Sequence, residues 1–256
     1  MILNFEQHLN PQTQSTPIVF IHGLFGSLSN LGMLARAYFE THHVIQIDVR
    51  NHGKSGHSSE MNYAVMAQDI VDTLDSLNID KFIVVGHSMG GKIAMHLAQQ
   101  YPNRIEKLAV LDIAPFAYTQ NHHDQIFKAL IAVEQANLST RSEAIALMKQ
   151  YISEEMVIQF LLKSWHKGQW LFNVNALNTH YADILSWPIS TTFTGPTLFL
   201  KGEKSPYIQK DEHFEAIQTQ FPNAEITKIE EAGHWLHAEK TTDVLNALNV
   251  FLNSKY

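Results

Sequence analysis

The sequence predicts an α/β fold with a mostly parallel central sheet, helices on both faces, and a helical segment inserted late in the chain. Short apolar runs alternate with longer amphipathic ones, which is typical of βαβ units. The apolar runs are rich in Val, Ile, Leu or Phe and are followed by Gly, Asp, Asn or Ser, as expected of strands that are buried on both faces. The alternation stops once, between about residues 114 and 193. We therefore expect one sheet domain with a single insertion.

The apolar runs place five clear strands and a weaker one along the chain. The clear strands are predicted at residues 18–21, 44–47, 82–85, 108–111 and 197–200, and the weaker one at 224–229. Helical patterns between and after them cover residues 30–39, 63–77, 90–100, 206–220 and 242–252. Pro102 closes the third of these helices and Pro222 follows the fourth, in agreement with the usual helix-stop signals.

The interruption between strands is predicted to be a helical cap. Helical patterns occur near residues 122–137, 140–151, 153–164 and 174–185, and no strand is predicted in this segment. Trp187-Pro188 and Gly195-Pro196 mark the return to the sheet. We therefore predict a core domain of residues 1–113 and 194–256 and a cap of residues 114–193.

Composition excludes several classes of function. The 256 residues include no cysteine, which rules out disulfides, zinc–thiolate sites and iron–sulfur clusters. The formal charge is −7 and no cluster of lysines or arginines forms a basic stripe, so no nucleic-acid partner is expected. The first nine residues do not resemble a signal peptide, and no apolar stretch approaches membrane-spanning length. We expect a cytoplasmic protein that acts on a small molecule, without a membrane partner.

The strongest chemical signal lies at residues 86–90, Gly-His-Ser-Met-Gly. A buried strand precedes this Gly-x-Ser-x-Gly run and a helix follows it, which is the context of a nucleophile elbow. Glycines on both sides of the serine let the neighbouring strand and helix approach closely. Ser88 is the predicted nucleophile, and the backbone N–H of Met89 is a predicted oxyanion donor.

A serine nucleophile needs an adjacent base, and His234 has the expected position. It lies after the last strand and before the final helix, consistent with the chain order serine, acid, histidine. His237 is expected to point elsewhere and to be structural. The second oxyanion donor is predicted at the N–H of Leu24, in the His-Gly-Leu-Phe-Gly loop after the first clear strand.

The acid that orients the base is less clear. The usual position, after the strand that follows the cap, holds Ser205 in the run Gly-Glu-Lys-Ser-Pro. Asp112, at the end of the preceding strand, is the preferred acid, because it could bind the Nδ1–H of His234. Ser205 is then expected to support the same histidine by a hydrogen bond. Glu203 remains an alternative acid.

With these residues in place, the sequence resembles the α/β-hydrolases, and specifically the YbfF-type bacterial esterases. The most specific matching segments are residues 22–27, 48–55, 86–92, 112–115, 205–207 and 233–235. The resemblance implies an esterase or thioesterase with a helical cap that acts on acyl esters or acyl-CoA. It also implies that Ser88 and His234 are catalytic and that the Asp112–Ser205 arrangement belongs to the group. The segment 48–55 is expected to be structural.

The predicted reaction is ester or thioester hydrolysis through an acyl-enzyme, without metal or organic cofactor. The cap is expected to supply the acyl pocket, drawing on Phe116, Phe127, Leu130, Phe160, Trp165, Trp170, Phe172 and Trp187. The residues predicted to contact substrate are Phe25, Lys92, Phe116, Trp165 and Trp235, and Lys92 could meet an anionic substrate. The pairs His42-His43 and His122-His123 are expected to be solvated rather than metal ligands.

Other functions are compatible with the same residues. A carbon–carbon bond hydrolase or an acyltransferase would share the serine and the histidine. A hydrolase-fold binding protein without activity is a third possibility, although the intact serine, histidine and oxyanion loop argue against it. Dehalogenase and epoxide hydrolase chemistry use a carboxylate where this chain has Ser88. Acyl length, leaving group and oligomeric state are not determined by the sequence.

Overall fold

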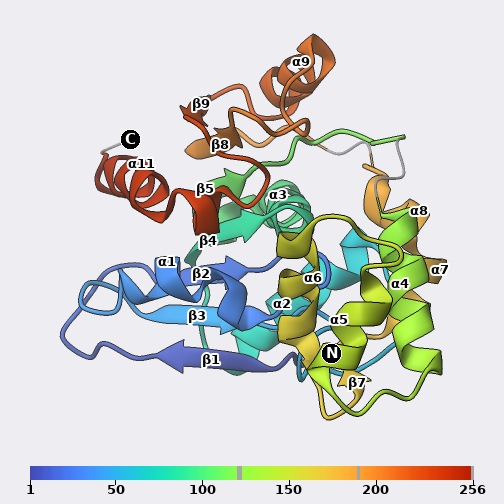
Figure 1. Cartoon of the computed structure of the whole chain (residues 1–256). Helices are drawn as coiled ribbons and strands as arrows, with labels where there is room; N and C mark the ends of the chain where they lie inside the picture. The colour runs from blue at the N-terminus through green and yellow to red at the C-terminus, as the bar shows by residue number, and fades with distance from the viewer. Residues whose placement is uncertain (120–122, 189–190, 255–256) are drawn as a thin grey trace.

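The computed structural model describes residues 1–119, 123–188 and 191–254, and it is built around a seven-stranded sheet (Figure 1). The strand order is β1-β3-β2-β4-β5-β8-β9, and only β1 runs antiparallel to its neighbour. The strands are β1 (Phe5–His8), β2 (Ile18–Ile21), β3 (Val44–Ile47), β4 (Phe82–His87), β5 (Ile105–Leu111), β8 (Thr197–Gly202) and β9 (Ala224–Ile229). The predicted α/β fold with a mostly parallel sheet is confirmed.

The alternation of side chains along each strand creates a hydrophobic core on each face of the sheet. In β2, Val19 and Ile21 join one core, whereas Ile18 and Phe20 join the other. Helices α2 (Tyr63–Ser76) and α3 (Met89–Gln100) cover the first core. Helices α1 (Gly32–Arg36), α10 (Leu236–Glu239) and α11 (Thr241–Asn253) cover the second. Burial on both faces explains why the strand sequences are almost uniformly apolar.

Three elements of the sheet domain differ from the prediction. The edge strand β1 was not expected, because Phe5 is its only large apolar residue and the strand is mostly exposed. The helix predicted at residues 30–39 is a 3₁₀ turn, η1 (Leu28–Leu31), followed by the five-residue α1. The helix predicted from residue 206 begins only at Asp211, as α9 (Asp211–Gln220), so the residues before it form a loop at the end of β8. A second 3₁₀ turn, η2 (Pro102–Arg104), precedes β5.

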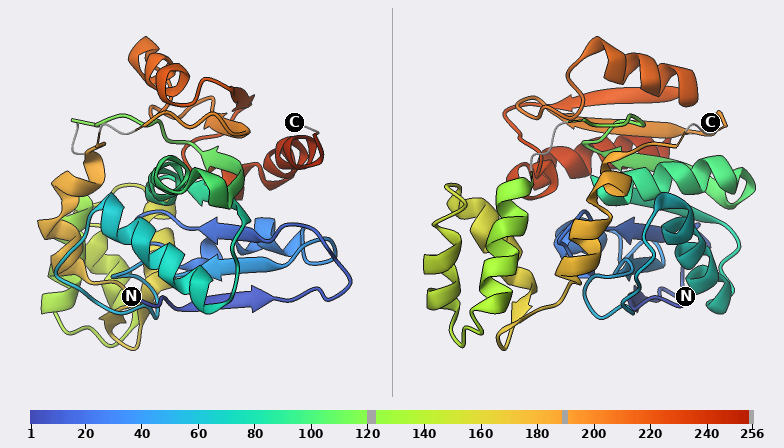
Figure 2. Two further views of the ribbon diagram at one scale, coloured as in Figure 1. Left: turned by 180° about the vertical axis from the view of Figure 1, so that it is seen from behind. Right: turned by 90° about the vertical axis from the view of Figure 1, so that its right-hand side faces the viewer.

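The segment between β5 and β8 is mainly helical, as predicted, and lies outside the sheet (Figures 1 and 2). Its helices are α4 (Asp124–Gln135), α5 (Arg141–Met148), α6 (Glu155–Leu161), η3 (Leu162–Ser164), α7 (Val174–Thr179) and α8 (Tyr181–Leu185). The expected absence of strands here was wrong, because β6 (Trp165–His166) and β7 (Gln169–Trp170) form a small antiparallel pair. Residue 122, where the first of these helices was predicted to begin, lies outside the described residues. The arrowheads of β2 and β3 point towards these helices in Figure 1, so the segment faces the carboxyl edge of the sheet. The exact division into core and cap stays a prediction.

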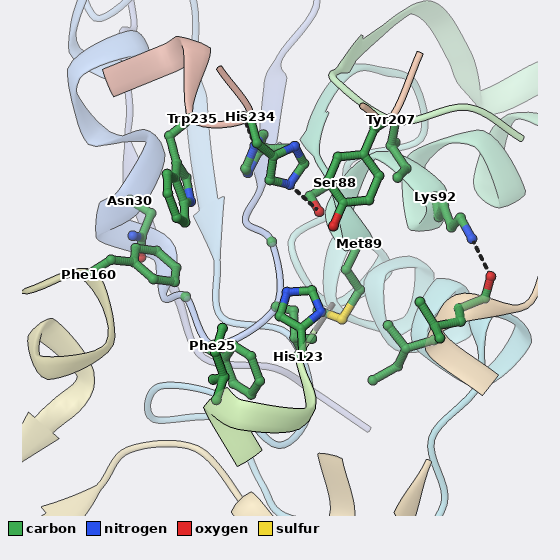
Figure 3. A pocket seen from close by; sticks show the side chains of 18 of the residues that line it. Phe25, Asn30, Ser88, Met89, Lys92, His123, Phe160, Tyr207, His234 and Trp235 are labelled. Atoms are coloured by element: carbon green, nitrogen blue, oxygen red, sulfur yellow. Dashed lines mark hydrogen bonds between the residues drawn. The ribbon is translucent and has the colours of Figure 1, made fainter. Parts of the chain in front are cut away.

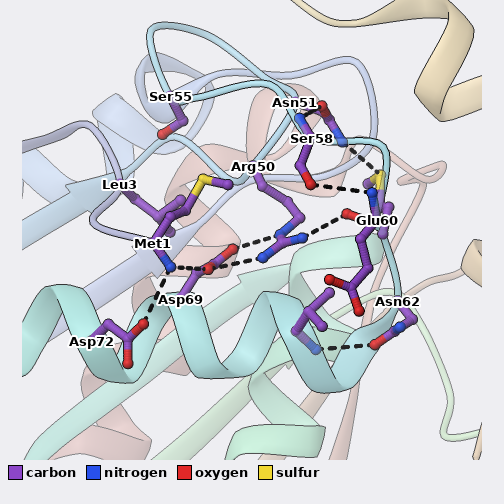
Figure 4. Close-up of polar contacts among 12 residues, drawn as sticks. Met1, Leu3, Arg50, Asn51, Ser55, Ser58, Glu60, Asn62, Asp69 and Asp72 are labelled. Atoms are coloured by element: carbon purple, nitrogen blue, oxygen red, sulfur yellow. Dashed lines mark hydrogen bonds and ion pairs between the residues drawn. The ribbon is translucent and has the colours of Figure 1, made fainter.

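The loop after β3 is anchored to α2 by a buried ion pair (Figure 4). Arg50 Nε lies 2.6 Å from Asp69 Oδ2, and its Nη2 lies 2.9 Å from Asp69 Oδ1. Arg50 Nη1 donates to the carbonyl oxygen of Glu60 at 2.6 Å, which ties the far end of the loop to the same guanidinium. Both side chains are almost fully buried. Hydrogen bonds between them are electrostatically stronger there than at the surface, because the local dielectric constant is low. Arg50 therefore holds both ends of the loop that follows β3 against α2.

Candidate active site

Ser88 stands on a sharp turn between β4 and α3 (Figure 3). Its φ and ψ of 54° and −119° lie in a region that L-residues rarely adopt, so the turn is strained. The two flanking glycines make that turn possible. A Cβ on Gly86 would lie 2.2 Å from the carbonyl oxygen of Gly90, and a Cβ on Gly90 would lie 2.2 Å from that of Ile21. The close approaches expected from the Gly-x-Ser-x-Gly run are therefore present on both sides of the serine.

Ser88, His234 and Asp112 form a continuous chain of hydrogen bonds. His234 Nε2 lies 3.0 Å from Ser88 Oγ, and its Nδ1 lies 2.7 Å from Asp112 Oδ2. Asp112 is completely buried at the end of β5, with a positive φ of 56° that turns its carboxylate towards the histidine. Its other oxygen, Oδ1, accepts the N–H of Gly202 at 2.8 Å. With the carboxylate on Nδ1–H, Nε2 is left as the acceptor for the serine proton.

Ser205 and Glu203 differ from the sequence prediction. Ser205 was expected to support His234 by a hydrogen bond. In the structure, Ser205 Oγ donates a short hydrogen bond to Asp112 Oδ2, so it supports the acid instead. Glu203 points away from the site, accepting the N–H of Glu231 at 2.8 Å and lying 3.2 Å from Lys228 Nζ. Glu203 is held on the side of β9 by these two contacts, whereas Ser205, two residues later, is buried against Asp112. The carboxylate that faces His234 is therefore the one on β5.

The loop after β2 carries the second predicted oxyanion donor. Within the described part of the chain, the N–H groups of Leu24 and Met89 donate to no protein acceptor, and both residues line the cleft above Ser88. Phe25, the next residue, has a φ of 62°, which bends the loop back on itself. Free amides at the start of α3 and in this loop can bind a developing oxyanion.

Two buried histidines that sequence reasoning did not assign hold this loop in place. His52 Nε2 accepts the N–H of Phe25 at 3.2 Å while its Nδ1–H donates to the carbonyl oxygen of Arg50 at 2.9 Å. His22 Nε2 accepts the N–H of Val49 at 3.0 Å in the same way. Burial lowers the pKa of His22 and lowers that of His52 to about 3, so both rings are neutral, as these contacts require. The signal was the histidine in each of the segments 22–27 and 48–55, but only the fold brings them together.

Two further residues contact the ring of His234. Tyr207 packs on one side with a ring-centroid distance of 4.2 Å, and His87 packs at 4.8 Å. His87 Nε2–H also donates to the backbone carbonyl oxygen of His234 at 2.9 Å, and burial keeps the pKa of His87 well below its usual range. His237, expected to be structural, lies 4.3 Å from His87 and does line the cleft. The base is thus held by packing as well as by Asp112.

The serine opens into a cleft of about 780 Å³, its open mouth included, between the sheet domain and the helices α4, α6 and α8. Of the residues predicted to contact substrate, Phe25, Lys92 and Trp235 line this cleft. Phe116 and Trp165 do not, because Phe116 packs against Tyr118 and His213, and Trp165 pairs with Trp170 across β6 and β7. Among the eight aromatic and apolar residues considered for the acyl pocket, only Phe160 lines the cleft. The others are packed away from it, some within the helical segment and some against the sheet domain, as Phe172 against Phe25 and Trp187 against Tyr63 show.

Lys92 lines the cleft, but its ammonium group is engaged with the backbone of α8. Nζ donates to the carbonyl oxygens of Leu185 at 3.0 Å and Ser186 at 2.8 Å, and lies 4.9 Å from the ring centre of Tyr118. Burial lowers its pKa to about 7. Lys92 therefore ties α3 to the end of α8, and a direct contact with an anionic substrate stays a prediction.

Neither a metal cluster nor a membrane-spanning helix occurs within the described ranges. No group of three or more His, Asp or Glu side chains there could hold a metal ion. Of the two histidine pairs considered, His42 lies 2.9 Å from Thr41 Oγ1 and His123 contacts the hydroxyl of Tyr181, whereas residue 122 lies outside those ranges. None of the helices in those ranges is long and apolar enough to cross a bilayer.

Comparisons with known proteins agree with this geometry. Residues 16–128 match the family described as the alpha/beta hydrolase fold. The chain is 48% identical to esterase YbfF of Escherichia coli over 94% of its own length and 95% of that protein. It is 42% identical to the sn-1-specific diacylglycerol lipase ABHD11 of Danio rerio, over 93% of this chain and 78% of that lipase.

A solved structure extends the likeness to three dimensions. A marine microorganism esterase, 32% identical in sequence, superposes with a TM-score of 0.89 over 98% of this chain and 99% of that one. Identity of this level over nearly the full length, together with the elbow at Ser88, leaves one assignment. The chain belongs to the α/β-hydrolase family and, within it, to the esterases of the YbfF type.

Proposed function

We propose that the protein hydrolyses carboxylic esters through an acyl-enzyme on Ser88. The observation that carries this proposal is the chain of contacts from Ser88 Oγ through His234 to Asp112 Oδ2, with Ser88 and His234 lining a largely apolar cleft. A serine hydroxyl is a weak nucleophile until a base removes its proton, and His234 Nε2 lies at hydrogen-bond distance for that step. The names of the relatives, an esterase and a diacylglycerol lipase, support the same bond type.

In the first half of the reaction, Ser88 Oγ attacks the ester carbonyl carbon while His234 takes its proton. The negative charge on the carbonyl oxygen is held by the N–H groups of Leu24 and Met89, and losing one such donor typically costs roughly 10²–10³ in turnover. Asp112 stabilises the imidazolium without accepting its proton. His234 then protonates the departing alcohol oxygen, and the acyl group stays on Ser88.

In the second half, water replaces the alcohol. His234 takes a proton from that water, the resulting hydroxide attacks the acyl-enzyme, and Ser88 recovers its proton as the acid leaves. The same steps would cleave a thioester, with a thiol as the leaving group, so acyl-CoA hydrolysis is a finer form of the proposal. We also expect the enzyme to act in the cytoplasm on small-molecule substrates.

A matched set of substrates tests the proposal. Wild-type protein and the Ser88→Ala variant are assayed against p-nitrophenyl esters of increasing acyl length and against the corresponding acyl-CoAs. Ser153→Ala, which changes an exposed serine that does not line the cleft, is the control. We expect turnover by wild type and the control, and loss of turnover in Ser88→Ala.

Three outcomes separate the alternatives. Full activity in Ser88→Ala would refute the mechanism. Acyl transfer to an added alcohol in place of hydrolysis would indicate an acyltransferase. Turnover of esters alone would restrict the proposal to oxygen esters and remove its acyl-CoA part.

A further inference from the structure

A second cavity adjoins the catalytic cleft on the side of α6 and α10. Its volume is about 700 Å³, open to solvent, and it shares four residues with the cleft: Asn30, Phe160, Trp235 and His237. We call this cavity the α6–α10 groove. Figure 3 places Asn30, Phe160 and Trp235 on one side of Ser88 and Lys92 on the other. The cleft therefore extends from Ser88 in two directions, which we call its arms. One arm runs towards Trp235 and Phe160 and continues into the groove, and the opposite arm runs towards Lys92.

The boundary between the cleft and the groove is an aromatic pair. Phe160 comes from α6 and Trp235 from the turn before α10, and their ring centres lie 5.6 Å apart at an interplanar angle of 40°. Aromatic faces of this kind bind flat or extended apolar groups at little entropic cost. A substrate segment that passes from the serine into the groove must pass these two rings.

The position of the base indicates which part of an ester enters this arm. The alcohol oxygen must receive its proton from His234 Nε2, so the leaving group has to depart along the histidine. Trp235 follows His234 in the chain, and their ring centres are 6.3 Å apart. At the opposite arm, Lys92 ties α3 to the end of α8, whereas the groove is open to solvent. We therefore expect the alcohol to leave the acyl-enzyme on the side of His234 and to reach solvent through the groove.

The charges of the groove favour an anionic ligand. Lys163 lines it and makes no ion pair or hydrogen bond with any residue that the structure describes. The acidic side chain of the groove, Glu155, is already occupied, with Lys149 Nζ at 2.8 Å and Gln159 Nε2 at 2.8 Å. Burial lowers the pKa of His237 to about 3, so its ring is uncharged, and within the described residues its Nδ1 has no hydrogen-bond partner. The unbalanced charge in the groove is therefore positive.

We propose that the α6–α10 groove is the leaving-group subsite, and that it selects alcohols with an apolar segment against Phe160 and Trp235 and an anionic group at Lys163. This inference rests on the proposed ester hydrolysis at Ser88. It assigns the acyl chain to the opposite arm, which Lys92 and Leu185 line. Lys163 is exposed, so its substitution should leave the fold intact.

The test uses two butyrate esters that differ only in charge. One is the ester of 3-(4-hydroxyphenyl)propanoate, and the other is the ester of its primary amide, whose phenol has nearly the same acidity. We expect wild type to favour the carboxylate ester through a lower KM, by about threefold in kcat/KM at low salt, as for a solvent-exposed charge pair. Lys163→Gln should abolish the preference and Lys163→Glu should reverse it. Lys167→Gln, which removes an exposed positive charge of the same segment outside the groove, should leave it unchanged.

A second pair of substrates checks the direction of binding. It carries the charge on the acyl side, as phenyl esters of succinate and of succinamate, and the Lys163 variants should treat these two esters as wild type does. An effect of Lys163 on the acyl pair would overturn the inference, because the groove would then hold the acyl chain. Equal hydrolysis of the two butyrate esters by wild type and all variants would overturn it as well, while leaving ester hydrolysis intact. If wild type hydrolysed none of the four esters, the proposed function itself would fail.

Discussion

The substitution Asp112→Asn tests whether the carboxylate at the end of β5, and no other acid near His234, orients the base. Asp112 is completely buried and accepts three hydrogen bonds, from His234 Nδ1 at 2.7 Å, from Gly202 N at 2.8 Å and from Ser205 Oγ. Asparagine has nearly the same shape, but one of its two terminal atoms is a donor. If the amide nitrogen faces His234, the imidazole must present an unprotonated Nδ1 to it, and Nε2 then carries the proton. His234 can no longer accept the proton of Ser88.

The expected size of the effect follows from this change of tautomer. A wrongly oriented imidazole in a serine triad lowers kcat by about 10⁴-fold, which corresponds to roughly 5.4 kcal/mol at 1.36 kcal/mol per factor of ten. This exceeds the roughly 10²–10³ expected for one oxyanion donor. The assay is steady-state hydrolysis of p-nitrophenyl butyrate, with thermal unfolding to show that the variant is folded. Glu203→Gln is the matched control, because it also replaces a carboxylate by its amide a few residues from the site.

The reasoning is refuted by either of two results. Asp112→Asn that retains more than about a tenth of wild-type turnover would show that Asp112 does not set the tautomer of the base. A loss of several orders of magnitude in Glu203→Gln would move the role to an acid whose carboxylate lies at the surface, in contact with Lys228 and Glu231.

Three further predictions follow from the same structure. Ser205→Ala removes one donor from the buried Asp112 carboxylate, so urea unfolding should show a loss of about 1.5–3 kcal/mol, with turnover reduced less than in Asp112→Asn; unchanged stability would contradict it. Gly90→Ala places a Cβ 2.2 Å from the carbonyl oxygen of Ile21, and thermal unfolding should show a loss of about 3 kcal/mol or more, or no folded protein at all. His52 has a pKa lowered to about 3, below its unfolded value of 6.5, so between these values the unfolded chain binds more protons and stability falls as pH falls. In His52→Gln, the free energy of unfolding, measured by urea titration from pH 7 to pH 4, should fall less steeply than in wild type, by up to about 1.4 kcal/mol per pH unit. An unchanged slope would refute the argument.

Most of the sheet could be predicted because its strands carry their own signal. Strands buried on both faces need mostly apolar residues, and β2, β3, β4, β5 and β8 each contain a run of Val, Ile, Leu, Phe or Ala, although β3 also holds Gln46 and β5 also holds Lys107. The edge strand β1 is mostly exposed and has no fully buried residue, so its sequence carries no apolar run that would mark it as a strand. The two-residue strands β6 and β7 are too short to have any period.

At the site, the sequence was informative where chemistry depends on a local backbone. The turn at Ser88 needs glycines on both sides, and that requirement is visible in five consecutive residues. The partner of Ser205 was misassigned because it depends on how the loops after β5 and β8 meet, which involves residues far apart in the chain. Aromatic residues such as Trp165 could not be divided into cleft and helix core, because both environments demand the same side chains.

Covalent labelling of Ser88 tests the central claim most directly. Wild-type protein and Ser88→Ala are incubated with a fluorophosphonate, and the mass of each intact protein is compared with the turnover that remains. The mechanism predicts one label per wild-type chain, located by peptide mapping at Ser88, with activity falling in proportion to the label. No labelling of the wild type, or equal labelling of Ser88→Ala, would contradict it.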